Sequence, residues 1–122
     1  MQTTLFREQW QASIDWIDNS LQKISDEEML LPIAPSGNSA IWIFGHLIHA
    51  EDLLSVLLTG DSFQYPEYAP LFARGTFPKD ASFYPPVDVL REAWKNVTDK
   101  SGKVVAGFSD ATWDEPHCLI TN

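Results

Sequence analysis

Positive charge is scarce in this chain. Only 8 Lys and Arg residues stand against 17 Asp and Glu residues, which leaves a net charge of −9 over 122 residues. A chain this acidic is repelled by phosphate backbones and by anionic lipid. The few basic residues form no local cluster that would act as an exception. The sequence therefore predicts a protein without nucleic-acid partners and without an attachment to membranes.

Cysteine and long apolar runs are scarce as well. Cys118 is the single cysteine, so no disulfide can form within the chain, which agrees with a reducing compartment. Met1 is followed by polar residues rather than by a basic start and an apolar run, which argues against a signal peptide. Histidines and carboxylates between residues 46 and 52 interrupt the best apolar stretch before it reaches about 18 residues. We expect one cytoplasmic domain that covers residues 1–122.

Three stretches carry the alternating three-and-four spacing of apolar residues that is typical of amphipathic helices. They cover residues 4–24, 38–60 and 86–108. The capping-box spacing at residues 25–28 predicts a short helical turn after the first of them. No segment has the alternation of a strand, and no Gly-rich phosphate loop, paired CxxC motif or Ser/His/Asp arrangement is present. The sequence therefore predicts an all-α fold.

The helix predicted over residues 38–60 is the most apolar of the three. Asn38 or Ser39 is expected to cap its start, and Gly60 to end it. One stripe within about 40° of a single direction is expected to be buried, and it comprises Trp42, His46, Ala50, Leu53 and Leu57. Glu51, Asp52 and Ser55 point the other way and are expected to face solvent. The back of this helix also carries Ile41, Phe44 and Ile48, so we expect it to make contacts on both sides.

The first helix is expected to bury a seam formed by Trp10, Ile14, Ile17, Leu21 and Ile24, with Trp16 widening the buried face. The segment at residues 61–86 contains five prolines, which forbid a long helix, and seven aromatic rings. So many rings predict a connection packed across the bundle. Two interpretations stay open for it, because the segment either covers a pocket or caps one end of the core.

A histidine in the middle of an apolar stripe must find a partner for its ring nitrogens. Taken alone, His46 is either a satisfied core histidine or a metal ligand. The stretch NSAIWIFGHL at residues 38–47, YAPLFARGTFP at 68–78 and YPPVDVL at 84–90 occur here in one order. Together they resemble the DinB-like family (DNA-damage-inducible protein B superfamily), over nearly the whole chain.

The resemblance implies an up-up-down-down four-helix bundle with a long ordered crossover between helices two and three. It also implies a divalent metal, nickel or zinc, held near one end by three ligands, of which the helix-two histidine maps onto His46. The other two would come from a His-x-x-x-His or Glu-x-x-x-His pair on helix four, which has no counterpart before Asn122. We therefore expect three long helices and a C-terminally incomplete domain. His49 and His117 are the weaker candidates for further ligands.

By this resemblance the chain is a metal-binding relative of hydrolases or thiol-dependent transferases that act on small molecules, with a pocket lined by Trp42, His49 and Leu53. Without the helix-four ligands we expect this chain alone to be inactive. The alternative is a non-catalytic helical module that has lost the metal and self-associates, because three seams leave an apolar trough that predicts a homo-oligomer, most simply a dimer. A third hypothesis is that the chain is a shortened version of a longer gene product. The family name suggests a link to DNA damage, but the acidic composition predicts no contact with DNA.

Overall fold

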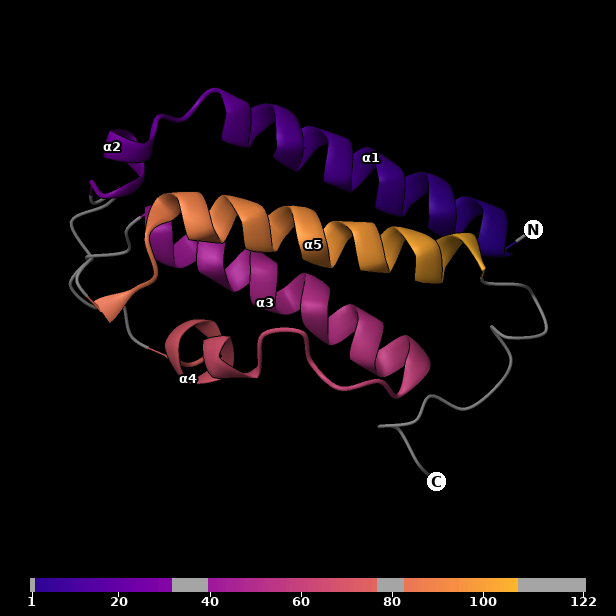
Figure 1. The fold of residues 1–122 in the computed structure, drawn as a ribbon. Helices are drawn as coiled ribbons and strands as arrows, with labels where there is room; N and C mark the ends of the chain where they lie inside the picture. The colour runs from indigo at the N-terminus through magenta and orange to yellow at the C-terminus, as the bar shows by residue number, and fades with distance from the viewer. Residues whose placement is uncertain (1, 32–39, 77–82, 108–122) are drawn as a thin grey trace.

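The computed structural model describes residues 2–31, 40–76 and 83–107, and every regular element in these ranges is helical. Three long helices dominate, namely α1 (Gln2–Gln22), α3 (Ala40–Thr59) and α5 (Val87–Ala106) (Figure 1). The short helices α2 (Asp26–Met29), η1 (Pro66–Tyr68) and α4 (Ala69–Phe72) lie between them along the chain. The predicted all-α fold is confirmed for these ranges. They contain no fourth long helix, and the four-helix arrangement stays a prediction.

Two predicted helix boundaries are built as the sequence indicates. The Ser25 hydroxyl accepts the Glu28 N–H at 3.1 Å, and the Glu28 carboxylate accepts the Ser25 N–H at 3.0 Å, which completes the capping box of α2. These bonds lower the pKa of Glu28. Gly60 ends α3 with φ +79°, a left-handed conformation that costs glycine little. The proposed cap residues Asn38 and Ser39 lie outside the described residues.

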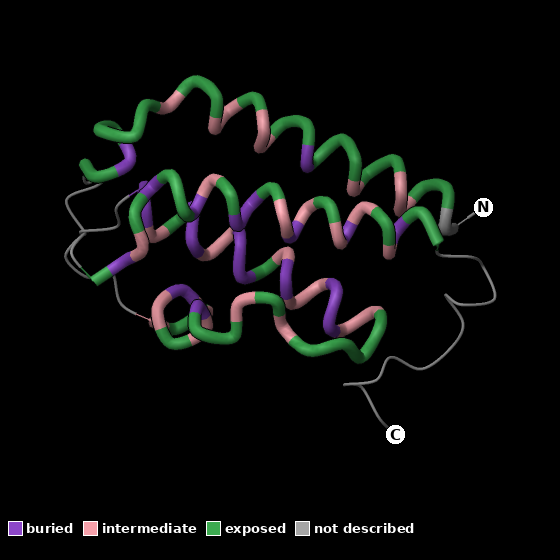
Figure 2. The backbone as a smooth tube through the Cα atoms, viewed as in Figure 1, coloured by how far each residue is buried: buried purple, intermediate pink, exposed green. Residues whose placement is uncertain are grey.

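The core lies mainly where α3 and α5 face each other. Figure 2 shows the buried segments of these two helices turned toward one another, whereas most of α1 is exposed. Leu90 and Val97 of α5 and Ile48 of α3 are fully buried. The spacing predicted for the third helix is confirmed at Val87, Leu90, Trp94, Val97 and Ser101, all of which are buried. At about 1.5–3 kcal/mol for each large apolar side chain, this pair of helices supplies most of the hydrophobic stabilisation.

The prediction of which face of α3 is buried was wrong. The packed face carries Ile41, Phe44, Ile48, Asp52 and Ser55, all at most 2% exposed. The predicted stripe is half-buried at Trp42, His46, Leu53 and Leu57, and Ala50 is exposed. Helix α3 is apolar around most of its circumference, so the spacing of its apolar residues does not identify a solvent-exposed face. Contact with α5 and the crossover determines which side is buried. The expectation that the back of the helix also makes contacts is confirmed.

Helix α1 rests on this pair through the seam predicted for it. Ile14 is buried, and the other seam residues pack partly buried against the core: Trp10, Ile17, Leu21 and Ile24. Trp16 does not widen the buried face, because it is 71% exposed.

Hydrogen bonds complete the attachment of α1. Glu51 accepts the Trp10 indole N–H at 3.1 Å and the Ser101 hydroxyl at 2.6 Å, so a residue predicted to face solvent joins all three long helices. Asp18 accepts the Trp94 indole N–H at 2.6 Å. These hydrogen bonds hold α1 against α3 and α5, where α1 buries few apolar side chains.

By length and composition, α3 is the one helix among the described residues that is apolar enough to cross a membrane. Core helices of soluble bundles meet the same measures, and the packed face of α3 holds a buried carboxylate and a buried hydroxyl. The hydropathy of α3 is therefore consistent with its place in the core of the bundle.

Candidate functional site

The crossover after α3 is tied to that helix by a buried carboxylate. Asp52, 1% exposed, accepts the backbone N–H of Gln64 at 3.0 Å through one oxygen and that of Tyr65 at 2.9 Å through the other. Tyr68 and Phe72 then enter the core. Within residues 61–76 the predicted packing across the bundle is confirmed. The correction is Asp52, which was expected to be solvated and instead anchors the crossover.

Phe72 of the crossover contacts both Gly45 and His46 of α3. A Cβ atom at position 45 would overlap the Phe72 ring, so only glycine lets this fully buried ring reach the backbone of α3. The next residue, His46, contacts the backbone carbonyl of the same phenylalanine at 2.8 Å through Nδ1. Because Phe72 ends α4, its carbonyl has no partner within that helix. Ring and carbonyl together dock α4 on α3.

This contact determines which nitrogen of His46 carries the proton. A carbonyl only accepts, so Nδ1 must be the donor and, in the neutral ring, Nε2 keeps its lone pair. The ring is half-buried and stacks on Trp42 with centroids 5.2 Å apart and planes 10° apart. Trp42 is held in turn by a 3.1 Å hydrogen bond from its indole N–H to the Thr76 hydroxyl. His46 is therefore a fixed imidazole with its accepting nitrogen directed away from the anchoring carbonyl.

His49 is in a different environment. It is 8% exposed, stacks on Phe63 at 5.5 Å, and has a buried Nδ1 without a hydrogen-bond partner among the described residues. Burial lowers the pKa of His49, and the nearby His46 lowers it further, while Asp52 opposes both. The net shift favours the neutral ring. Because His49 is buried, it packs against the crossover and is poorly accessible as a metal ligand.

Among the described residues, the remaining sequence candidates add no metal ligand at His46. Leu53 is half-buried on α3, and His117 and Cys118 lie outside the described residues. Within residues 2–31, 40–76 and 83–107 no three His, Cys, Asp or Glu side chains converge in a way that would hold a metal ion. The described residues thus supply one oriented histidine and not a complete ligand set.

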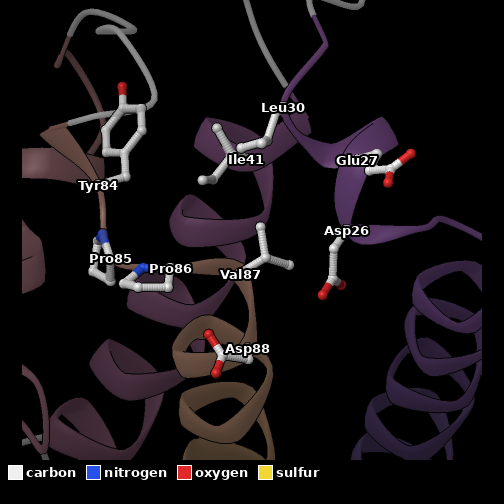
Figure 3. A pocket seen from close by; sticks show the side chains of 9 residues that line it. All are labelled: Asp26, Glu27, Leu30, Ile41, Tyr84, Pro85, Pro86, Val87 and Asp88. Atoms are coloured by element: carbon white, nitrogen blue, oxygen red, sulfur yellow. The ribbon is translucent and has the colours of Figure 1, made fainter.

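A cavity of about 500 Å³ opens at the end of the bundle where α2 meets the start of α5. In Figure 3 the α2 carboxylates Asp26 and Glu27 lie on one side of it and Tyr84 on the other, with Val87 between them. Asp26 also binds Arg91 at 2.8 Å. Sequence reasoning missed this cavity. The capping box and the Pro85–Pro86 pair each mark a helix start, but nothing local predicts that the two starts meet.

Two apolar depressions lie between α1 and α3. A narrow groove of about 160 Å³ is lined by Ile17, Leu21, Phe44 and neighbouring side chains, and a more open one of about 610 Å³ by Trp16 and Ile43 among others. They share Trp16, Ile17, Ile43 and Leu47, so they form one continuous trough. No charged residue lines either depression.

Comparison with known proteins identifies the family of the chain. The family model described as the DinB superfamily matches residues 5–119, nearly the whole chain. No curated protein matches the sequence. The match includes the Gly45–His46 pair, the crossover and α5.

Proposed function

The chain belongs to the DinB superfamily, and from that premise we propose that it is a metal-binding member in which His46 Nε2 is one ligand of a divalent ion, nickel or zinc. The observation that supports this most is the 2.8 Å bond from Nδ1 to the Phe72 carbonyl. Metal-binding histidines typically donate their second ring nitrogen to a carbonyl or carboxylate, which fixes the tautomer and orients the ring. Stacking on Trp42 adds to this orientation.

One imidazole does not make a site, because catalytic zinc takes three ligands from the protein and structural zinc takes four. The other ligands must come from outside the described residues, and His117 is the candidate that the sequence offers. A bound divalent ion would lower the pKa of a water or thiol, which is the chemistry that a hydrolase or thiol-dependent transferase needs. A cytoplasmic location with its thiol pool suits that role.

Metal analysis tests the proposal on protein purified without a histidine tag, incubated with nickel or zinc and desalted. The informative variant is His46→Asn, because the asparagine amide can donate to the Phe72 carbonyl as Nδ1 does but offers no counterpart of Nε2. We expect about one metal per site in the native chain, and at least a tenfold loss in His46→Asn with unchanged helical circular dichroism.

His117→Asn is the matched histidine variant. A loss of metal equal to that in His46→Asn would identify His117 as a second ligand, and retention would exclude it. A native chain that binds neither ion above background would refute the metal proposal and favour the second candidate, a helical module that self-associates. That candidate is supported by the charge-free trough between α1 and α3.

A further inference from the structure

Two side chains of α3 and two groups of the crossover form a closed cycle of contacts. On α3, Trp42 and His46 are about one helical turn apart, and their rings stack with planes 10° apart. The Phe72 carbonyl accepts the His46 Nδ1–H at 2.8 Å. The Thr76 hydroxyl accepts the Trp42 indole N–H at 3.1 Å. Because α4 lies against α3 here (Figure 1), the crossover holds the stacked pair at both of its rings.

A tight turn links the two crossover groups. The Thr76 N–H donates to the Ala73 carbonyl at 3.0 Å, and Gly75 has φ +91°, a conformation that favours glycine at the third position of a turn. The Thr76 hydroxyl lies 2.7 Å from the Ala73 carbonyl and 3.2 Å from the Leu71 carbonyl, so its single proton is directed into the turn. Its lone pairs are therefore left for the Trp42 indole.

Each contact limits a different motion of the His46 ring. The hydrogen bond to the Phe72 carbonyl opposes a half-turn of the ring about χ2, which would place a carbon where Nδ1 now lies. Stacking on Trp42 opposes a tilt of the ring, as long as the indole is itself held in place. Thr76 holds the indole through its N–H. Without that hydroxyl the indole would shift along the imidazole, and the hydrogen bond from Nδ1 would lose its favourable angle.

His49 shows that stacking by itself does not orient a histidine on this helix. Its ring stacks on Phe63 with planes 10° apart, the same angle as in the Trp42–His46 pair. Its buried Nδ1 nevertheless has no hydrogen-bond partner among the described residues. The difference at His46 is the cycle of hydrogen bonds that passes through Phe72 and Thr76.

We propose that Thr76 is a positioning residue for His46, and that it acts through Trp42. The Nδ1–H tautomer of His46, and with it the affinity of Nε2 for a metal ion, depends on the Thr76 hydroxyl. The statement about metal affinity rests on the proposed function, whereas the statement about the tautomer does not. Substitution of the groups that orient a metal-binding histidine typically costs about 10–100-fold in metal affinity.

The first test is the tautomer of His46 in the metal-free chain, read by NMR from the chemical shifts of its ring nitrogens at pH 8. We expect the Nδ1–H form in the native chain and a mixture of both tautomers in Thr76→Val, which keeps the shape of the side chain and removes the hydroxyl. Thr76→Ser should restore the native pattern, because it keeps the hydroxyl. Helical circular dichroism checks that each variant folds.

Tyr65→Phe is the matched control. It also removes one hydroxyl from the crossover, which accepts the Asn96 side-chain amide at 2.8 Å, and it should leave the tautomer of His46 unchanged. A native tautomer in Thr76→Val, or the same change in Tyr65→Phe, would overturn the proposal.

Trp42→Phe tests the route from Thr76 to His46 without altering the turn. Phenylalanine keeps a ring for the stack but has no N–H for the Thr76 hydroxyl, so it should shift the tautomer as Thr76→Val does. The double variant should shift it no further, because both substitutions remove the same hydrogen bond. Additive shifts would refute the route through Trp42.

Nickel titration separates this inference from the proposed function. The Kd should be about tenfold higher in Thr76→Val than in the native chain, and Thr76→Ser and Tyr65→Phe should stay within about twofold of the native value. Equal Kd values for the native chain and Thr76→Val would overturn the inference and leave the proposed function standing. A native chain that binds no nickel or zinc would refute the metal-binding function, and the tautomer would still decide whether Thr76 positions His46.

Discussion

The two sides of α3 differ in a way that hydropathy does not reveal. The side packed on α5 and the crossover includes a histidine, a carboxylate and a hydroxyl, and the side that lines the trough toward α1 includes Ile43 and Leu47 and no charged residue. On the packed side, Asp52 meets two backbone amides, and such bonds to a charged group offset the cost of burying it. Polar residues on this helix therefore lie where another segment is bound, and the apolar side toward the trough carries no such bound segment among residues 2–31, 40–76 and 83–107.

Matched isoleucines on the two sides give the largest expected difference. Ile48→Ala should lower the free energy of unfolding by about 4 kcal/mol, because the side chain is fully buried between α3 and α5. Ile43→Ala should cost less than about 1 kcal/mol, because its side chain is partly solvated in a single chain. Urea denaturation measures both losses. Equal losses of unfolding free energy in the two variants would contradict the difference in packing between the two sides of α3.

Asp52→Ala should be the next largest loss, about 3 kcal/mol, because it leaves the Gln64 and Tyr65 amides without their charged acceptor. Amide hydrogen exchange should also accelerate at these two positions before the helices are affected. Asp99→Ala on the exposed side of α5 is the control and should stay within about 0.5 kcal/mol. A control loss as large as that of Asp52→Ala would mean that net charge, rather than the tie to the crossover, sets the effect.

Gly45→Ala tests the packed side of α3 at the point where Phe72 meets it. The added methyl group overlaps the Phe72 ring, and we expect a loss of about 2 kcal/mol despite the better helix propensity of alanine. At Gly102 of α5 an added Cβ would lie 3.4 Å from the Trp10 ring, so Gly102→Ala should be neutral or stabilise by up to about 1 kcal/mol. Thermal unfolding of the two variants compares them directly. A stabilising Gly45→Ala would contradict the close approach.

The smallest expected effect is a pH dependence from His49. Its folded pKa lies below the ordinary value of 6.5, because burial disfavours the charged ring, with His46 adding to the shift and Asp52 opposing it. The unfolded chain therefore binds more protons below about pH 6.5, so stability is complete above that pH and declines as the pH falls toward the folded pKa. Denaturation midpoints measured at pH 8 and at pH 5.5 should differ less in His49→Gln than in the native chain. An unchanged difference would place the titration elsewhere.

Short-range features of the sequence predicted much of the secondary structure. The capping box at Ser25, the glycine that ends α3 at residue 60, the three long helices and the seam of α5 each depend on residues within a few turns of one another. The family resemblance, carried by residues 38–47, 68–78 and 84–90, is confirmed by the match over residues 5–119. His46 was singled out from its position in an apolar stripe, and its role as a ligand stays a prediction.

The errors share a cause, which is that the deciding contact lies far away in sequence. Asp52 meets amides 12 and 13 residues further on. The partner of His46, which the sequence left open, is a carbonyl 26 residues further on. Glu51 bonds Trp10 and Ser101, 41 and 50 residues away. Periodicity records only neighbours within a helix, so it does not predict which face meets another element.

Caps, spacing and motif order are local properties, so the sequence alone indicates that the chain is helical, where its long helices lie and which family it belongs to. Long-range packing determines which side of α3 is buried, which nitrogen of His46 is anchored and which apolar surface the described residues leave uncovered. A helix that is apolar around most of its circumference can pack through either side with a similar hydrophobic gain. The choice therefore falls to the specific contacts of Phe72, Asp52 and Glu51 with distant parts of the chain.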